Sequence, residues 1–166
     1  AVHGERERYS YNYLKNIIKN NDYIIDIGAN IGYYSIIEAI LANSGFVFAI
    51  EPVLSNLELL QKNINSNGID NLTTFHLAIG DNNGTSKMYI YDESNYASMI
   101  VNPTSKVREE IIVPTMKLDT FIEHHLEGIP DFIRMDVEGY EYNILKGAKI
   151  CLSRNTPLRL NIEVHP

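Results

Sequence analysis

The sequence predicts a single α/β domain with a doubly wound, mostly parallel sheet. Two observations carry this prediction. Short, nearly continuous apolar runs alternate with segments whose apolar residues recur every three or four positions, and clusters rich in asparagine and glycine separate them. Strands that are apolar on both sides are typical of parallel sheets covered by helices on both faces. Ligands of such sheets bind beyond the carboxyl ends of the strands, so the residues after each apolar run are the first candidates for a functional site.

The first half of the chain alternates helix and strand regularly. Apolar residues at helical spacing predict a helix before Asn20 and two more helices over residues 33–41 and 54–64. Apolar runs predict buried strands over residues 23–27, 46–50 and 73–77. The clusters Asn43-Ser44-Gly45 and Asn67-Gly68 are expected to end the second and third helices.

The second half is less regular. Strands are expected over residues 86–91 and 110–113, with a long polar loop over residues 92–108 between them. A helix over 118–126, a strand over 132–137, a helix over 141–152 and a last strand over 158–164 follow. No internal repeat, low-complexity tract or linker divides the 166 residues, which we therefore interpret as one domain.

Composition narrows the possible partners. The formal net charge is −7 and the basic residues are dispersed, which argues against nucleic acid as a substrate. No stretch approaches the roughly 20 apolar residues that cross a bilayer, so we expect no membrane span. The single cysteine, Cys151, cannot form an intrachain disulfide and fits a reducing compartment. We therefore expect a cytoplasmic protein.

A glycine-rich turn follows the first predicted strand. Gly28 permits a tight turn, Gly32 opens the next helix, and Asp26 and Asn30 are placed beside them. Glu51 follows the second strand, where an acid can accept the hydroxyls of a ribose. The glycine spacing differs from that of dinucleotide-binding turns, and a carboxylate at Asp26 would repel phosphate but suit an ammonium group. The turn therefore predicts an adenosine ligand with a positively charged tail, although such a spacing also occurs in turns that bind nothing.

Longer stretches resemble the successive motifs of FkbM-type methyltransferases. They are YIIDIGANIGYYSI, VFAIEP, LLQKNINSNG, LAIGDNNG, KLDTFI and DFIRMDVEGYEYNILKGA, in the order of the family and spanning residues 23–163. The resemblance implies a class I (Rossmann-like) methyltransferase fold, with S-adenosylmethionine as donor and S-adenosylhomocysteine as product. It also implies transfer to a hydroxyl of a sugar or small molecule. By position, the methionine part would be held by Asp26, Gly28, Asn30 and Gly32, the ribose by Glu51, and the adenine by Ala78 and Ile79, with Asp81 close by.

The chain is accordingly divided into four parts by expected role. Residues 1–20 form an N-terminal helical segment, and residues 21–81 form the cofactor-binding half. Residues 82–115 contain the inserted strands and loop, and residues 116–166 form the acceptor-side half.

The acceptor chemistry is expected at the ends of the last two predicted strands. Asp136 is the first candidate, as a base or a substrate anchor, although a carboxylate there could instead only stabilise the start of a helix. Glu138 lies near the same turn. Glu163 and His165 alternate along the last strand and can share one face, so both are further candidates. With Asp136 they could hold a divalent metal, but the spacing is not diagnostic, and we expect no metal.

The carboxyl-terminal end departs from the family pattern. The family fold has seven strands, the last two forming a hairpin beside the fifth, whereas this sequence stops at Pro166. The expected fold therefore lacks that hairpin, and residues 158–164 would form an exposed apolar edge. Pairing of two copies through this edge is a hypothesis for a homodimer.

The leading interpretation is an O-methyltransferase acting on a small molecule or glycan. A second is a non-catalytic module that binds S-adenosylmethionine. A third, a nicotinamide-dependent oxidoreductase, is disfavoured by the glycine spacing. The identity of the acceptor does not follow from the fold.

Overall fold

The central element is a five-stranded sheet in which every pair of neighbouring strands is parallel. The computed structural model describes residues 2–91, 97–101 and 105–164, with side chains from Ser10 onward. The strand order is β3-β2-β1-β8-β9, with β1 in the middle. The strands are β1 (Tyr23–Ile27), β2 (Phe46–Ile50), β3 (Leu72–Phe75), β8 (Phe132–Met135) and β9 (Arg159–Ile162).

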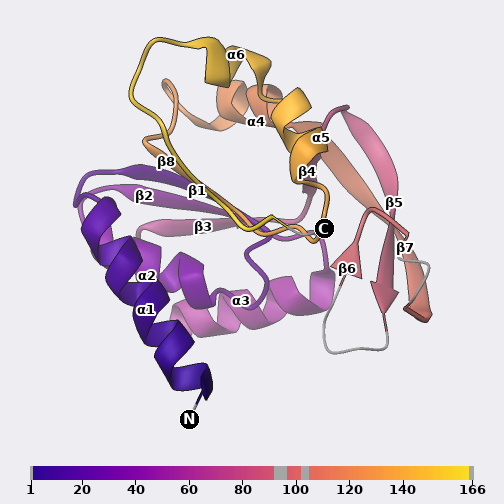
Figure 1. Cartoon of the computed structure of the whole chain (residues 1–166), viewed down its shortest axis with the longest axis horizontal. Helices are drawn as coiled ribbons and strands as arrows, with labels where there is room; N and C mark the ends of the chain where they lie inside the picture. Colours follow the sequence, from indigo (N-terminus) through magenta and orange to yellow (C-terminus); the bar gives the residue numbers. More distant parts are fainter. Residues whose placement is uncertain (1, 92–96, 102–104, 165–166) are drawn as a thin grey trace.

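Helices cover both faces of this sheet (Figure 1). One face carries α1 (Val2–Ile17), α2 (Tyr33–Leu41) and α3 (Leu54–Ser66), and the other carries α4 (Leu118–His125), α5 (Glu141–Lys146) and α6 (Lys149–Ser153). Each face has its own apolar core, the first including Leu14 and Leu60 and the second including Phe121 and Ile144. The doubly wound class is confirmed. In the described part of the chain, no helix combines the length and the apolarity needed to cross a membrane.

The apolar runs form strands because both of their faces are buried. Ile24 packs into the core beneath α1 to α3, whereas its neighbour Ile25 packs into the core beneath α4 to α6, and neither is exposed. If apolar and polar residues alternated along such a strand, the polar side chains would lie in one of the two cores, where water cannot reach them. The continuous apolar pattern therefore indicates that helices cover both faces of the sheet.

A second sheet lies beside the first. Its order is β4-β7-β5-β6, and it closes one side of the molecule in Figure 1. The sequence predicts strands over residues 86–91 and 110–113, and the second of these is part of the longer strand β7 (Val107–Lys117). The strand expected over residues 73–77 ends at Phe75. The chain then enters this second sheet. Its strands are β4 (Ala78–Gly80), β5 (Gly84–Tyr91), β6 (Ala97–Ser98) and β7 (Val107–Lys117).

The expected single helix over residues 141–152 is wrong. Two short helices, α5 and α6, are separated at Gly147, which is the C-cap of α5. Gly147 lies against the backbone of Gly80, and a Cβ there would overlap the Gly80 carbonyl oxygen. The break therefore lets the chain pass close to β4, an approach that the helical pattern alone does not reveal.

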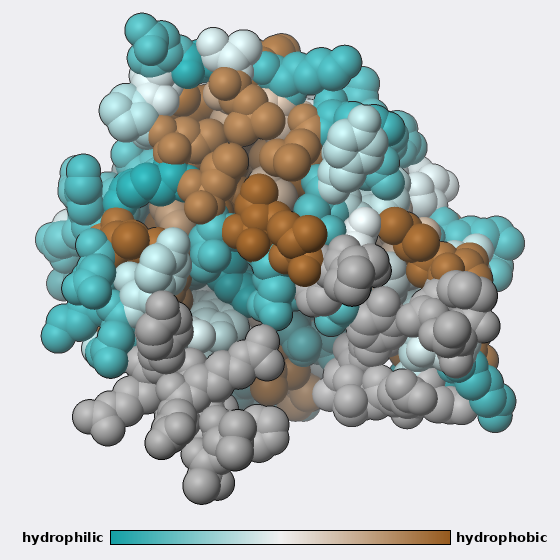
Figure 2. Space-filling view, viewed as in Figure 1, coloured by the Kyte–Doolittle hydropathy of each residue, from teal (hydrophilic) through white to brown (hydrophobic). Residues whose placement is uncertain are grey.

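Strands β3 and β9 are the two edges of the main sheet among the described residues. Figure 2 shows apolar side chains gathered over the region of α6 and β9. The exposed large apolar residues of these two elements and the residues after them are Ile150, Leu152, Leu160 and Val164. Of the apolar edge expected over residues 158–164, Leu160 and Val164 are exposed in the described chain, and the homodimer stays a prediction.

Candidate functional site

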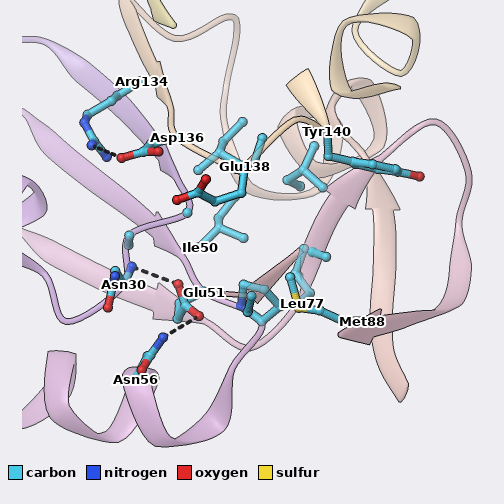
Figure 3. A pocket seen from close by; sticks show the side chains of 18 of the residues that line it. Asn30, Ile50, Glu51, Asn56, Leu77, Met88, Arg134, Asp136, Glu138 and Tyr140 are labelled. Atoms are coloured by element: carbon cyan, nitrogen blue, oxygen red, sulfur yellow. Dashed lines mark hydrogen bonds and ion pairs between the residues drawn. The ribbon is translucent and has the colours of Figure 1, made fainter. Parts of the chain in front are cut away.

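A cavity of about 220 Å³ opens at the carboxyl ends of β1, β2 and β8. These strands are in register there, because Ile27 pairs with both Ile50 and Met135. The segments that follow each strand form the walls: the turn after β1, the start of the β2–α3 connection, and the β8–α5 turn (Figure 3). The second sheet supplies the remaining wall through β4, β5 and β6.

The turn after β1 is tight and fixed by backbone contacts. The amides of Gly28 and Ala29 both donate to the carbonyl of Ile50, at 3.0 Å each. Gly28 has φ +81°, and a Cβ there would overlap the carbonyl oxygen of Asp136. The glycine is therefore needed where β1 meets the end of β8, a reason that the sequence interpretation did not include.

Two further residues of this turn have left-handed backbones. Gly32, with φ +89°, is the N-cap of α2 and packs against Leu60, but it does not line the cavity. Asn30, with φ +52°, does line it. Asparagine tolerates this conformation better than most residues do. The turn therefore presents Asn30, and not Gly32, to a ligand.

Glu51 lies at the end of β2, where the sequence placed it, and its side chain borders the cavity. Its carboxylate accepts hydrogen bonds from the backbone amides of Asn30 (2.8 Å) and Val53 (2.9 Å) and from the side chain of Asn56 (3.4 Å). Burial raises the pKa of Glu51, while the two backbone amides act in the opposite direction. These donors fix the carboxylate in place at the cavity wall.

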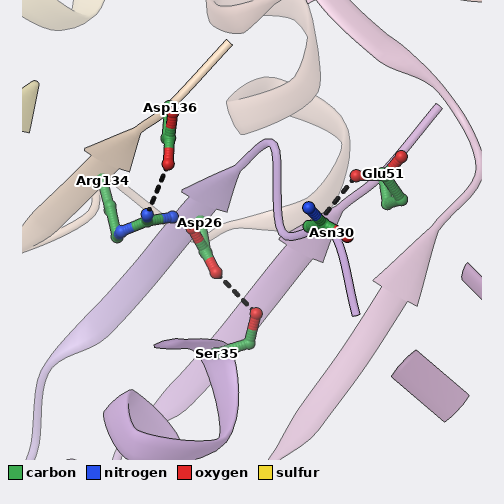
Figure 4. Close-up of polar contacts among 6 residues, drawn as sticks. All are labelled: Asp26, Asn30, Ser35, Glu51, Arg134 and Asp136. Atoms are coloured by element: carbon green, nitrogen blue, oxygen red, sulfur yellow. Dashed lines mark hydrogen bonds and ion pairs between the residues drawn. The ribbon is translucent and has the colours of Figure 1, made fainter. Parts of the chain in front are cut away.

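Asp26 differs from its expected role. Its side chain is fully buried beneath the turn and does not line the cavity, so the inference that it points toward a ligand's ammonium group is wrong. It accepts hydrogen bonds from Ser35 (2.5 Å) and from Arg134 (3.0 Å), as Figure 4 shows. A buried carboxylate needs such partners, because water cannot reach it. Asp26 therefore positions other groups.

Arg134 is the partner that the sequence interpretation missed. Its guanidinium joins Asp26 to Asp136, donating to each at 3.0 Å (Figure 4), and stacks 4.1 Å from the ring centroid of Tyr34. Burial alone would lower the pKa of Arg134, but the charges of Asp26, Glu38 and Asp136 together raise it above its usual value. Arg134 is therefore a permanently charged link between the β1 turn and the cavity wall.

Glu38 of α2 is a further carboxyl group beside this pair. It is fully buried, and neither of its oxygens has a hydrogen-bond partner among the described residues. Burial and the charge of Asp26 raise the pKa of Glu38 well above its usual value.

The β8–α5 turn brings two carboxylates to the cavity. Asp136 and Glu138 both line it, together with Glu51 on the opposite side (Figure 3). Glu138 has φ +53°, an uncommon conformation for a residue with a side chain. Ser98 of β6 holds this turn: its hydroxyl donates to the Glu138 carbonyl at 2.9 Å and accepts the amide of Ile100 at 3.1 Å. The inserted segment thus fixes the turn that carries Glu138.

The rest of the wall is largely apolar. Ala78 and Ile79, for which the family resemblance implies a place beside an adenine, line it, and β5 and β6 add Met88 and Ala97. Asp81 is exposed and does not line the cavity itself, so its expected place close to the adenine stays a prediction. Burial raises the pKa of Tyr140, and the charge of Asp81 raises it further.

Among protein families, the family model described as the methyltransferase FkbM domain matches residues 26–166 of this chain. The chain belongs to this family. The family resemblance drawn from the sequence motifs is thereby confirmed.

Solved structures share the fold of this FkbM-family chain. A methyltransferase FkbM from Methylobacillus flagellatus KT is 23% identical, with a TM-score of 0.57, and the match covers 84% of this chain and 32% of that one. An rRNA methylase from Streptococcus thermophilus is 12% identical, with a TM-score of 0.53, covering 88% and 62%. SMU.1697c from Streptococcus mutans, in complex with SAH, is also 12% identical, with a TM-score of 0.52, covering 89% and 64%. The chain thus spans less than two thirds of each of these proteins. A search of curated proteins finds no match.

The remaining acceptor-side candidates of this FkbM-family domain are Glu163 and His165. Glu163 is exposed and lines a neighbouring cavity, and His165 lies outside the described residues. Glu141 is buried and accepts the amide of Gly139 at 3.1 Å, which is a structural role. Among the described residues no group of three histidine, cysteine, aspartate or glutamate side chains is placed to hold a metal ion.

Proposed function

We propose that this domain binds S-adenosylmethionine in the cavity and transfers its methyl group to a hydroxyl of a small molecule or sugar. The observation that carries the proposal is the charge of the cavity. Glu51, Asp136 and Glu138 line it, whereas Arg134, the one cation among the described lining residues, is already paired with Asp26 and Asp136. Carboxylates repel a pyrophosphate and attract a ligand that carries a sulfonium and an ammonium group. The charge therefore favours S-adenosylmethionine over a nicotinamide dinucleotide.

The shape and chemistry of the walls fit the rest of this ligand. An ionised carboxylate has about four acceptor positions, so beside its three protein donors Glu51 keeps about one position for a ribose hydroxyl. Ala78, Ile79 and Met88 offer an apolar surface to an adenine ring. We therefore assign the ribose to Glu51 and the adenine to the wall formed by β4 and β5.

The chain must position the acceptor and take its proton. S-adenosylmethionine supplies a methyl group that is already activated, so the protein needs mainly to align the acceptor hydroxyl and to accept its proton. We assign the proton to the carboxylate of Glu138, because it borders the cavity on a turn that Ser98 fixes. Asp136, which Arg134 holds, is assigned to the ammonium group of the donor.

Calorimetry with S-adenosylhomocysteine and with NAD tests the donor site. We expect S-adenosylhomocysteine to bind and Glu51→Gln to weaken it about 10- to 100-fold, since hydrogen bonds to a charged group are worth about 1.5–3 kcal/mol. Glu58→Gln, at an exposed position of α3, is the matched control and should bind as the wild type does. Tighter binding of NAD than of S-adenosylhomocysteine would overturn the proposal.

A second assay tests the transfer. With a labelled methyl donor and a small-molecule extract, the wild type should label a hydroxyl-bearing compound, and Glu138→Gln should lose the label while still binding S-adenosylhomocysteine. Binding without label in any fraction would instead support the non-catalytic module.

A further inference from the structure

The second sheet contacts the cavity through a short segment, residues 97–100. Ala97 and Met99 line the cavity, whereas Ser98 between them is buried and does not line it. The hydroxyl of Ser98 holds the turn that carries Glu138. The proposed function assigns no role to the residue that holds this segment in place from the other side.

That residue is Tyr91, the last residue of β5. Its side chain is among the largest that are fully buried, and it does not line the cavity. Its hydroxyl donates to the carbonyl of Ile100 at 3.1 Å. A tyrosine hydroxyl that is buried needs such a partner, because water cannot replace it. Tyr91 therefore ties residues 97–100 to β5.

An irregularity of the sheet allows Tyr91 to reach this segment. The pairing of β5 with β7 passes from Ile90 opposite Glu109 to Tyr91 opposite Val107, so that Arg108 is skipped. Regular alternation would expose one of two successive side chains, but Ile90 and Tyr91 are 6% and 0% exposed. Bulges of this kind occur often beside active sites, where they change the direction of a side chain.

The hydrogen bonds form a continuous relay toward the cavity. Tyr91 donates to the carbonyl of Ile100, the amide of Ile100 donates to the hydroxyl of Ser98 at 3.1 Å, and this hydroxyl donates to the carbonyl of Glu138 at 2.9 Å. The side chain of Ile100 also lies over the turn, since a Cβ on Gly139 would be 3.8 Å from its Cδ1. The relay joins β5 to the turn whose Glu138 lines the cavity (Figure 3).

We propose that Tyr91 and Ser98 are positioning residues for methyl transfer, and that the relay between them fixes the place of the Glu138 carboxylate. The inference rests on the proposed function, because it takes Glu138 to accept the proton of the acceptor. It goes beyond that function by giving a role in the transfer to Tyr91, which lies outside the cavity.

The backbone of Glu138 explains why the turn needs this support. Its φ of +53° is uncommon for a residue with a side chain, and such a conformation persists only where the surroundings impose it. Without the relay the turn should relax, and a misplacement of about 1 Å at a reacting group can lower a rate about 100-fold. Glu51 and Asp136 have other partners, in Asn30 and Arg134, so donor binding should not depend on the relay.

The test compares the turn, the transfer and the donor site in the full chain. Tyr91→Phe and Ser98→Ala each remove one hydroxyl, and a double variant removes both. Tyr89→Phe, at a partly exposed position of the same strand, is the control. Nuclear magnetic resonance follows amide hydrogen exchange over residues 138–140, and calorimetry gives the Kd for S-adenosylhomocysteine. The initial rate of labelling of a small-molecule extract from labelled S-adenosylmethionine measures the transfer. Thermal unfolding checks the variants, and Tyr91→Phe, which keeps the ring, remains informative if Ser98→Ala is destabilised.

We expect both single variants to exchange at least threefold faster over residues 138–140 and to label at least fivefold more slowly than the wild type. The Kd for S-adenosylhomocysteine should stay within twofold, and Tyr89→Phe should match the wild type throughout. Because both hydroxyls act through one relay, the double variant should label within twofold of Ser98→Ala.

Wild-type exchange in Tyr91→Phe, wild-type labelling in either single variant, or losses that multiply in the double variant would each overturn the inference. An equal loss of S-adenosylhomocysteine binding would also overturn it, since the relay would then support the whole cavity. A wild type that does not bind S-adenosylhomocysteine, or that labels no compound, would count against the proposed function itself. The exchange of Tyr91→Phe would still decide whether the relay holds the turn.

Discussion

Removal of the Arg134 guanidinium should destabilise the domain strongly. In Arg134→Met the apolar stem is kept but Asp26 loses its ion-pair partner, and among the described residues only the Ser35 hydroxyl still donates to Asp26. The side chains of Arg134 and Asp26 are 6% and 0% exposed, so the value for surface ion pairs, about 0–1 kcal/mol, does not apply. Breaking a buried pair by removing one partner costs about 3–5 kcal/mol, because the other charge stays buried. That loss is a large share of a typical free energy of unfolding, about 5–15 kcal/mol.

Urea denaturation followed by far-ultraviolet circular dichroism measures this loss, and a double-mutant cycle assigns it. Asp26→Asn removes the buried negative charge that Arg134→Met leaves without a partner. The double variant with both substitutions should therefore recover at least half of the free energy of unfolding that Arg134→Met alone loses. Arg108→Met, at an exposed position of β7, is the matched control and should change stability by less than about 0.5 kcal/mol. A loss for Arg134→Met no larger than that of the control, or no recovery with Asp26→Asn, would refute the account of the buried pair.

Four further outcomes follow from the structure. Gly28→Ala adds both a strained positive φ, about 1–2 kcal/mol, and an overlap with β8, whereas Gly68→Ala, with φ +63° and open space, adds only the strain. Urea denaturation should therefore show the larger loss for Gly28→Ala, and equal losses would contradict the overlap. The pKa of Glu38 is raised in the folded state, so at pH values above the ordinary pKa of 4.5 the folded protein binds more protons than the unfolded protein does. The free energy of unfolding therefore falls as the pH rises from 4.5 toward the pKa of Glu38 in the folded state. Glu38→Gln should flatten this decline between pH 5 and pH 8, and an unchanged slope would assign it to other groups. Burial raises the pKa of Cys151 to about 11, so the thiol should react with a disulfide reagent at pH 8 only after unfolding, and fast reaction of the folded protein would show that it is accessible. If two copies pair through β9, light scattering should give a dimer that Leu160→Lys disrupts, whereas a monomer at high concentration would remove that hypothesis.

The layered architecture was predictable because burial on both faces leaves a direct trace in the sequence. The run at β1 is apolar at successive positions such as Ile24 and Ile25, which pack into opposite cores. The second sheet left a weaker trace. The stretch from Leu72 to Ile79 mixes apolar residues with threonine and histidine, and nothing in its pattern marks the change of sheet between β3 and β4. The break at Gly147 depends on contact with Gly80, which is distant in sequence.

The candidate site was predictable where a residue's place depends on the ends of strands. Glu51, Asn30 and Ala78 line one cavity, because the segments that follow the predicted strands meet at one edge, while their roles toward a cofactor stay predictions. Arg134 was missed although a signal existed: a cation within a buried strand needs a partner charge. Asp26 is its register partner on the neighbouring strand β1, but that pairing follows only from the strand order.

The buried charges give Asp26, at the start of the turn after β1, a structural role. The sequence alone suggests that Asp26 binds a cationic ligand, but in the structure its carboxylate accepts a hydrogen bond from Arg134. Arg134 in turn holds Asp136 at the cavity and stacks on Tyr34 at the wall between this cavity and the neighbouring one that Glu163 lines. One strand-to-strand ion pair therefore sets the place of a carboxylate in the first cavity and of an aromatic ring in the second. Because Asp26 is one of the two carboxylates that hold the guanidinium, Asp26→Asn alone should disturb both cavities, although Asp26 lines neither.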